Sequence, residues 1–204
     1  MIPHELPPKV TPLTYQSVIN SMLLVWEQTG TQPNRAAVRL ATAQIAIESG
    51  MRACMNYCIS GIKSKPNNGV RCWQYFQTSE FWTADEYEHQ AALGPNLIEA
   101  TDKYDGNRRK YLVHPKHPAC CFRAFETLDD AMLDHLLYLQ HNYPEAWDAL
   151  LKGYAIWFAH GLRQRGYFTA PERDYLAGER FRLAEEIAAV DEASLVWGDV
   201  AEYA

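Results

Sequence analysis

The chain has 204 residues, a formal net charge of −6 and a pI of about 5.6, so no overall positive field would draw it to nucleic acid. Its 48% hydrophobic and 12% aromatic residues are enough for the core of one large or two small domains. No apolar run approaches the ~20 residues that span a bilayer. We therefore expect a globular protein with no membrane span and no nucleic-acid partner.

The first dozen residues, 1–12, are rich in proline and are expected to be irregular. They lack the basic and apolar regions of a secretory signal peptide. The sequence as it stands therefore predicts a protein made in the cytoplasm, and any work outside it would need another route of delivery.

Two amphipathic helices are predicted next. Residues 14–28 carry apolar side chains at helical spacing, and Gly30 should stop this helix. Asn34 can cap a second helix, which runs to about Ser49 and ends at Gly50.

An acid stands on the apolar side of the second helix. Val38, Ala41, Ile45 and Glu48 follow one another at steps of three, four and three, so they share one face. Partial burial and the negative end of the helix would both raise the pKa of the Glu48 carboxyl. A carboxyl that stays protonated near neutral pH can serve as a general acid. The alternative is a glutamate that merely turns from the helix end to solvent.

Helical periodicity fades from residue 51 to about residue 125, where glycine, proline, asparagine and aromatic residues increase. Short strands are predicted at residues 70–76, 111–113 and 120–125, with a brief helix at residues 83–92. Several acids in this region could face a cleft, namely Glu80, Asp85, Glu86 and Glu88.

Helices resume at Thr127, whose hydroxyl can cap the next helix. Pro144 should open another helix, with Gly161 at its end, and a final helix is expected from about Pro171. Their apolar stripes are typical of core packing.

The predicted fold class is therefore α+β and mostly helical. Residues 13–50 and 127–190 would form a helical lobe, and residues 51–125 an inserted lobe of short strands and loops. We expect residues 1–204 to be a single domain.

The cysteines match no standard zinc pattern. Buried reduced thiols, one or two disulfides and a structural metal all remain open for Cys54, Cys58, Cys72, Cys120 and Cys121. The segment His-Pro-Lys-His-Pro at 114–118 could offer ligands, although its prolines favour a turn. We expect neither a metal nor another cofactor at the functional site.

Four short motifs appear in a fixed order: Gln-x-Ala-x-Glu-Ser-Gly at 44–50, Gly-Ile-Lys at 61–63, Phe-Arg-Ala-Phe at 122–125 and Gly-Tyr-Phe-Thr-Ala-Pro at 166–171. This order resembles the lysozyme-like N-acetylglucosaminidases of bacterial autolysins and flagellar rod-associated hydrolases. The resemblance implies a lysozyme-like fold that hydrolyses β-1,4 glycosidic bonds of peptidoglycan.

The resemblance also implies roles for two carboxylates. Glu48 would protonate the glycosidic oxygen as the general acid. Glu80, in the segment Thr78-Ser79-Glu80, would steady the oxocarbenium-like transition state or activate water.

Substrate-binding roles follow from the same comparison and from residue chemistry. Tyr167 matches a tyrosine near the scissile bond, and Lys63 would shape the turn beside the acid. Tyr175 is the next tyrosine after the last motif, at a longer spacing than in the family. Trp82 offers a flat apolar surface for a sugar ring, as do Trp73, Tyr75 and Tyr167, and each of the four is equally suited to a core.

Two departures from the family pattern leave the substrate register and the cleaved bond open. Cys58 replaces an asparagine before the Gly-Ile-Lys turn, and Phe168-Thr169-Ala170-Pro171 replaces Ala-Thr-Asp-Pro. A lytic transglycosylase or a catalytically silent wall-binding or virion structural protein could share this pattern. The expected partner is the peptidoglycan glycan strand, reached in the periplasm after phage-type or secretion-type delivery, with any immunity or delivery protein unknown.

Overall fold

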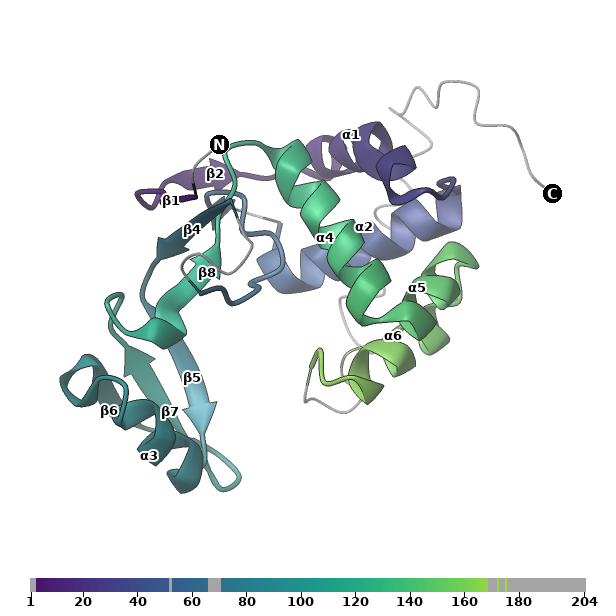
Figure 1. Ribbon diagram of the computed structural model, residues 1–204. Coiled ribbons are helices and arrows are strands. Elements are labelled where there is room, and N and C mark those ends of the chain that lie inside the picture. The colour runs from purple at the N-terminus through teal and green to yellow at the C-terminus, as the bar shows by residue number, and fades with distance from the viewer. Residues whose placement is uncertain (1–2, 52, 66–70, 169–171, 173–174, 176–204) are drawn as a thin grey trace. The chain divides into compact units, whose positions relative to one another are not determined.

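The computed structural model describes residues 3–51, 53–65 and 71–168, together with Glu172 and Tyr175. The protein has a mixed α+β fold in which helices predominate, as predicted. Two compact units each combine separate stretches of the chain (Figure 1). The helical unit comprises residues 11–54 and 127–204, and the strand unit comprises residues 1–10 and 55–126.

Side-chain caps begin three helices of the helical unit; the sequence predicted caps at Asn34 and Thr127, and a helix from Thr14. Thr14, Asn34 and Thr127 each accept a hydrogen bond from the backbone N–H three residues later. The described helices of this unit are α1 (Tyr15–Trp26), the 3-10 turn η1 (Glu27–Thr29), α2 (Arg35–Ser49), α4 (Leu128–Asn142), α5 (Pro144–Leu151) and α6 (Ala155–Gln164).

Aromatic and aliphatic side chains fill the interior of the helical unit. Helix α4 packs against α1 and α5, and helix α2 packs against the same two helices (Figure 1). Trp26 and Trp147 are buried and stack with ring centroids 5.7 Å apart, which fastens α1 to α5. Other large side chains that are fully buried here are Ile19, Met22, Ile45, Met132, Leu136, Leu139, Leu150, Phe158 and Leu162.

The prediction of one helix from Pro144 to Gly161 is wrong. The helix is interrupted at Gly153, which has a left-handed φ of 69°, and α6 begins after it and continues past Gly161. A Cβ at Gly153 would lie 2.5 Å from the Cβ of Ala36, so this turn also lets the chain approach the start of α2 closely. Gly161 lies inside α6, where glycine is required because a Cβ would lie 2.7 Å from the backbone nitrogen of Ala146.

The strand unit contains two three-stranded sheets. In one, β4 (Cys72–Tyr75) lies between β1 (His4–Glu5), which is parallel to it, and β8 (Cys121–Arg123), which is antiparallel. In the other, β7 (Arg108–Val113) lies between β5 (Thr78–Trp82) and β6 (Ile98–Asp105), all antiparallel. Helix α3 (Ala84–Ala91) and the 3-10 turns η2 (Pro95–Leu97) and η3 (Pro118–Cys120) complete the described elements of this unit. A separate pair joins β2 (Val10–Pro12) to β3 (Ala53–Met55).

The expectation of an irregular stretch over residues 1–12 is wrong at β1 and β2. Backbone pairing forms β1 despite the prolines around it, since His4 N–H donates to the Arg71 carbonyl and Leu6 N–H to that of Trp73. Strand β6 was not predicted because its side chains are mostly exposed and polar. The final helix expected from Pro171 lies outside the described residues apart from Glu172 and Tyr175, which are both helical.

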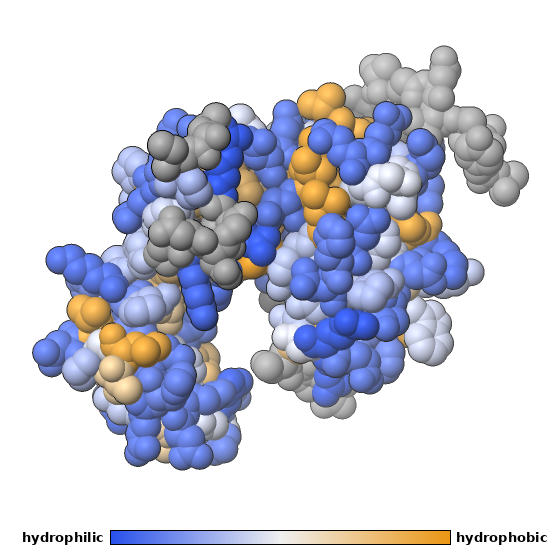
Figure 2. Space-filling model, viewed as in Figure 1, coloured by the Kyte–Doolittle hydropathy of each residue, from blue (hydrophilic) through white to orange (hydrophobic). Residues whose placement is uncertain are grey.

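The visible surface of the described residues is largely hydrophilic, with separate hydrophobic patches (Figure 2). Among the described helices, none combines the length and apolarity that a bilayer crossing requires. The cysteines are present as thiols, and all except Cys54 are buried in the strand unit. Within the described residues, no cluster of three histidine, cysteine or acidic side chains could hold a metal ion.

Candidate functional site

The C-terminal end of α2 presents Glu48. Gly50 ends the helix in the left-handed conformation, with its N–H bonded to the Ala46 carbonyl at 2.9 Å. Ile45 is buried one turn before Glu48, but Glu48 itself is exposed. The expected partial burial of Glu48 is therefore wrong, because the apolar face of α2 is covered only as far as Ile45 and Ala46.

Tyr175 approaches the Glu48 carboxylate. Its hydroxyl donates to Glu48 Oε1 at 3.3 Å, and its side chain is buried. The ring of Tyr175 lies on that of Phe168, with centroids 3.8 Å apart and planes 2° from parallel. Tyr175, which follows the last motif and stacks on its Phe168, thus contacts the glutamate of the first motif, more than 100 residues away in sequence.

A direct contact between the first and last motifs lies one turn further back on α2. The side-chain amide of Gln44 donates from Nε2 to the Tyr167 hydroxyl oxygen at 2.7 Å. On its other side, Gln44 Oε1 lies 2.7 Å from Nε2 of His135 on α4. Since a carbonyl oxygen can only accept, His135 Nε2 is the donor. Gln44 and His135 are both buried.

The environment of Tyr167 disfavours its phenolate. Burial raises the pKa of Tyr167 well above its ordinary value, and the charge of nearby Glu48 raises it further. The ring is also packed edge-on against Tyr143, with centroids 5.3 Å apart. Tyr167 is therefore a fixed, protonated hydroxyl near the end of α2.

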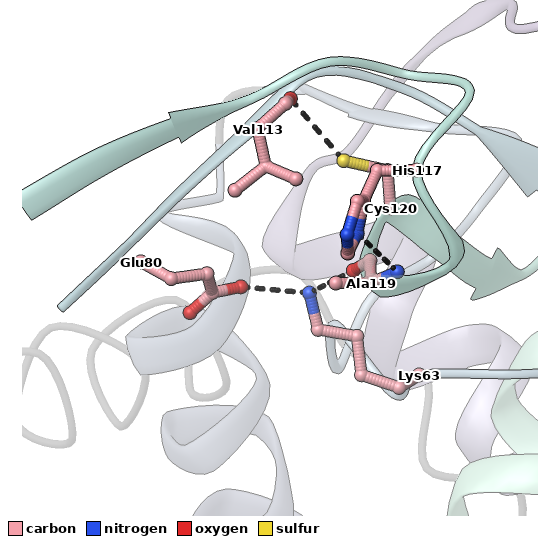
Figure 3. Close-up of polar contacts among 6 residues, drawn as sticks. All are labelled: Lys63, Glu80, Val113, His117, Ala119 and Cys120. Atoms are coloured by element: carbon pink, nitrogen blue, oxygen red, sulfur yellow. Dashed lines mark hydrogen bonds and ion pairs between the residues drawn. The ribbon is translucent and has the colours of Figure 1, made fainter. Parts of the chain in front are cut away.

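The strand unit holds the other predicted carboxylate. Lys63 Nζ donates to Glu80 Oε1 at 2.7 Å and to the Ala119 carbonyl at 2.7 Å (Figure 3). The same ammonium lies 4.0 Å from the centroid of the Phe122 ring. Side-chain exposures of 47% for Lys63 and 32% for Glu80 leave this pair accessible to solvent.

The second and third motifs meet beside this ion pair. Arg123 N–H donates to the Ile62 carbonyl at 3.0 Å, and Ser64 N–H donates to the Cys121 carbonyl at 2.9 Å. Lys63 and Phe122 form an isolated antiparallel bridge between these bonds. The Gly-Ile-Lys turn is thus held on strand β8, which sets the direction of the Lys63 side chain.

His117 and Cys120 shape the loop that offers the Ala119 carbonyl. His117 Nδ1 accepts from Ala119 N–H at 3.0 Å, and its Nε2 donates to the Gln90 carbonyl at 3.0 Å. Cys120 Sγ donates to the Val113 carbonyl at 3.2 Å (Figure 3). Both His117 nitrogens are used in backbone contacts, so this histidine of the 114–118 segment has a structural role.

Trp82 lies on the same strand as Glu80. Residues two apart on a strand point to the same face, so Trp82 and Glu80 share one side of β5. Trp82 stacks on Tyr111 with centroids 5.5 Å apart, and Tyr111 stacks in turn on Tyr87 of α3. Trp82 is half-buried at the end of this aromatic stack.

The predicted residues therefore fall into two groups. Glu48, Tyr167 and Tyr175 come together in the helical unit, and Lys63 and Glu80 come together in the strand unit with Trp82 on the same strand as Glu80. Sequence reasoning assigned no role to His135 or Gln44. The available signal was a histidine on the buried stripe of α4, between Met132 and Leu139.

No protein-family model matches the chain, and no curated protein matches it by sequence. Among solved structures, this chain is similar to the crystal structure of a peptidoglycan hydrolase from Sphingomonas sp. A1. The alignment covers 90% of this chain and 94% of the hydrolase chain. The sequence identity is 17% and the TM-score is 0.45. At these values the alignment carries no conclusion about activity.

Proposed function

We propose that the protein is a glycosidase that cleaves β-1,4 bonds in the glycan strands of peptidoglycan, as an N-acetylglucosaminidase or muramidase. The observation that carries the proposal is the contact of Glu48 with Tyr175 beside the Gln44–Tyr167 hydrogen bond. These contacts unite the first and last motifs of the family that the sequence resembles.

Glu48 is the proposed general acid. Its exposed position at the end of α2 allows a glycosidic oxygen to reach hydrogen-bond distance of its carboxyl. Sugar rings bound over the carboxyl would displace its water, which favours the protonated acid that the reaction needs. The proton would pass to the leaving oxygen as the bond to the anomeric carbon breaks.

The two tyrosines of the helical unit would assist this step as hydroxyl donors. Tyr175 already donates to Glu48 Oε1, so it can stabilise the carboxylate that remains after proton transfer. Tyr167 keeps its proton because burial raises its pKa, so it can donate to the carboxylate or to the substrate.

Glu80 is the proposed second carboxylate, supporting the oxocarbenium-like transition state or activating water. Lys63 fixes one of its oxygens through the 2.7 Å contact, and Trp82 on the same face of β5 offers a ring for stacking with a sugar. The separation of the two carboxyls would decide between retention, at ~5 Å, and inversion, at ~6.5–9.5 Å.

Digestion of purified sacculi tests the proposal. The wild-type protein and Glu48→Gln are incubated with sacculi, and the products are identified by mass spectrometry with and without borohydride reduction. Reducible N-acetylglucosamine or N-acetylmuramic acid ends made only by the wild type would support the hydrolase and name the bond. Anhydro-muramic ends would instead identify a lytic transglycosylase. Intact sacculi, where a control lysozyme works, would favour a silent wall-binding or structural protein.

A further inference from the structure

We propose that His135 is a positioning residue that acts through Gln44 to hold the Tyr167 hydroxyl as a hydrogen-bond donor pointing away from Gln44. Its kinetic consequence rests on the proposed function, whereas the direction of the hydrogen bonds does not. Neither His135 nor its connection to Tyr167 was evident from the four motifs.

His135, Gln44 and Tyr167 form a hydrogen-bonded relay. The relay has a direction because the side-chain amide of Gln44, its middle member, has an oxygen at one end and a nitrogen at the other. His135 Nε2 donates to Gln44 Oε1 at 2.7 Å, which leaves the amide nitrogen of Gln44 facing Tyr167 at 2.7 Å. A phenol has one hydrogen, and the Tyr167 oxygen already accepts from Gln44. Its own hydrogen must therefore point elsewhere.

His135 determines this direction. If His135 Nε2 carried no hydrogen, the Gln44 amide would have to turn over to place its nitrogen toward the imidazole. Its oxygen would then face Tyr167 and take up the tyrosine hydrogen. Gln44 and His135 are each 1% exposed, so water cannot substitute for a mismatched partner without cost.

At Tyr167, the main quantity that can vary is the direction of the hydroxyl hydrogen. Its ring is packed against Tyr143, which limits movement of the oxygen. The charge of Glu48 is close enough to raise the pKa of Tyr167, in addition to burial, so the hydroxyl remains protonated. A donor near a carboxyl that becomes charged as it gives up its proton stabilises the transition state.

Nitrogen NMR of the histidine rings tests the direction without any assay of activity. Protein labelled with ¹⁵N at histidine gives shifts that distinguish protonated from bare ring nitrogens, and loss of signals in His135→Gln assigns the residue. We expect a protonated Nε2 in the wild-type chain. A bare Nε2 would overturn the inference, whatever the enzyme does.

A double-mutant cycle on sacculi tests the consequence. We expect His135→Leu to lower kcat about tenfold with little change in KM, and His135→Gln, whose amide can donate to Gln44, to recover most of that loss. In the Tyr167→Phe background, His135→Leu should cost less than about twofold, because the hydroxyl it positions is gone.

The matched control is Leu139→Ala, a buried residue one turn later on α4 that takes no part in the relay. Thermal melts identify the temperature at which every variant is folded. If His135→Leu lowered kcat equally with Tyr or Phe at position 167, as Leu139→Ala would, its role would be packing and the inference would fail. If the wild type cleaved no glycan, the proposed function would fail and the NMR result would still decide the relay.

Discussion

The two candidate carboxylates have different partners. Glu48 receives a hydrogen bond from the hydroxyl of Tyr175, whereas Glu80 contacts the ammonium group of Lys63. A neutral hydroxyl can form a hydrogen bond with a carboxyl group whether or not that group is protonated. A positively charged ammonium group stabilises the ionised carboxylate. The Lys63 contact agrees with the proposed role of Glu80 as an electrostatic partner.

Replacing Tyr175 with phenylalanine tests the hydroxyl that contacts Glu48. The ring can stay stacked on Phe168, so we expect a change of less than about 1 kcal/mol in the free energy of unfolding. The kcat on sacculi should fall by about fivefold to tenfold, since one donor to the carboxylate is lost. Tyr154→Phe, at an exposed tyrosine of the same unit, is the control. Equal kcat values for the two variants would exclude the role of Tyr175.

The Lys63–Glu80 pair should matter to activity more than to stability. Because both side chains are partly exposed, Lys63→Met and Glu80→Gln should each change the free energy of unfolding by about 1 kcal/mol or less. Both substitutions should lower kcat. The kcat of the double variant should be only slightly below that of the less active single variant. Lys152→Met, which breaks the exposed pair with Asp148, serves as the control. Additive losses of kcat would show that Lys63 does not act through Glu80.

Sequence reasoning could select Glu48 but not its surroundings. A glutamate on an apolar helical face is visible in the spacing, whereas its exposure depends on which neighbouring elements cover the last turn of α2. The sequence did not single out His135, because its position between Met132 and Leu139 is typical of a core residue. Its partner Gln44 lies 91 residues away, and no local pattern connects the two.

At the scale of elements, helix ends were more predictable than strands. Thr14, Asn34 and Thr127 form caps through bonds to residues three positions ahead, so the signal is local. The break between α5 and α6 was missed because apolar spacing continues across Gly153, and only its approach to Ala36 explains the turn. Strand β6 carries mostly exposed side chains, which hides the alternation that predicts strands.

Gly153→Ala should destabilise the helical unit. The left-handed φ costs any other residue about 1–2 kcal/mol, and the new Cβ would also collide with Ala36. We expect a total loss of about 2–4 kcal/mol in urea unfolding. Gly30→Ala is the matched control, because its φ of +74° is similar but a Cβ there meets nothing within 4 Å. Equal losses for the two variants would show that the contact with Ala36 is unimportant.

At the scale of the whole molecule, each unit unites two of the four motifs. Gln44 of the first motif and Tyr167 of the last meet in the helical unit, and the motifs at 61–63 and 122–125 meet in the strand unit. Each pairing joins segments at least 59 residues apart, so the assembly depends on the folded core of its unit. The order of the motifs could be read from the sequence, but their pairwise contacts could not.

A thiol and a phenol of the strand unit predict a loss of stability at high pH. Burial raises the pKa of Cys120 above its ordinary value of 9.0, and that of Tyr75 from 10.0 to about 12. The unfolded chain would release these protons first. Stability should therefore be fully present below about pH 9 and fall as the pH rises toward 12. Urea unfolding between pH 7 and 11 measures this, and a constant free energy of unfolding throughout would contradict it.

The central claim is that Glu48 supplies a proton to the leaving oxygen, and a comparison of two substrates tests it most directly. Glu48→Gln is assayed on sacculi and on an aryl chito-oligosaccharide whose phenolate leaves without protonation, with the exposed Glu27→Gln as control. We predict a loss of at least about 100-fold on sacculi and less than about tenfold on the aryl substrate. Equal losses on both substrates, or undiminished cleavage of sacculi by Glu48→Gln, would contradict the role of Glu48 as general acid.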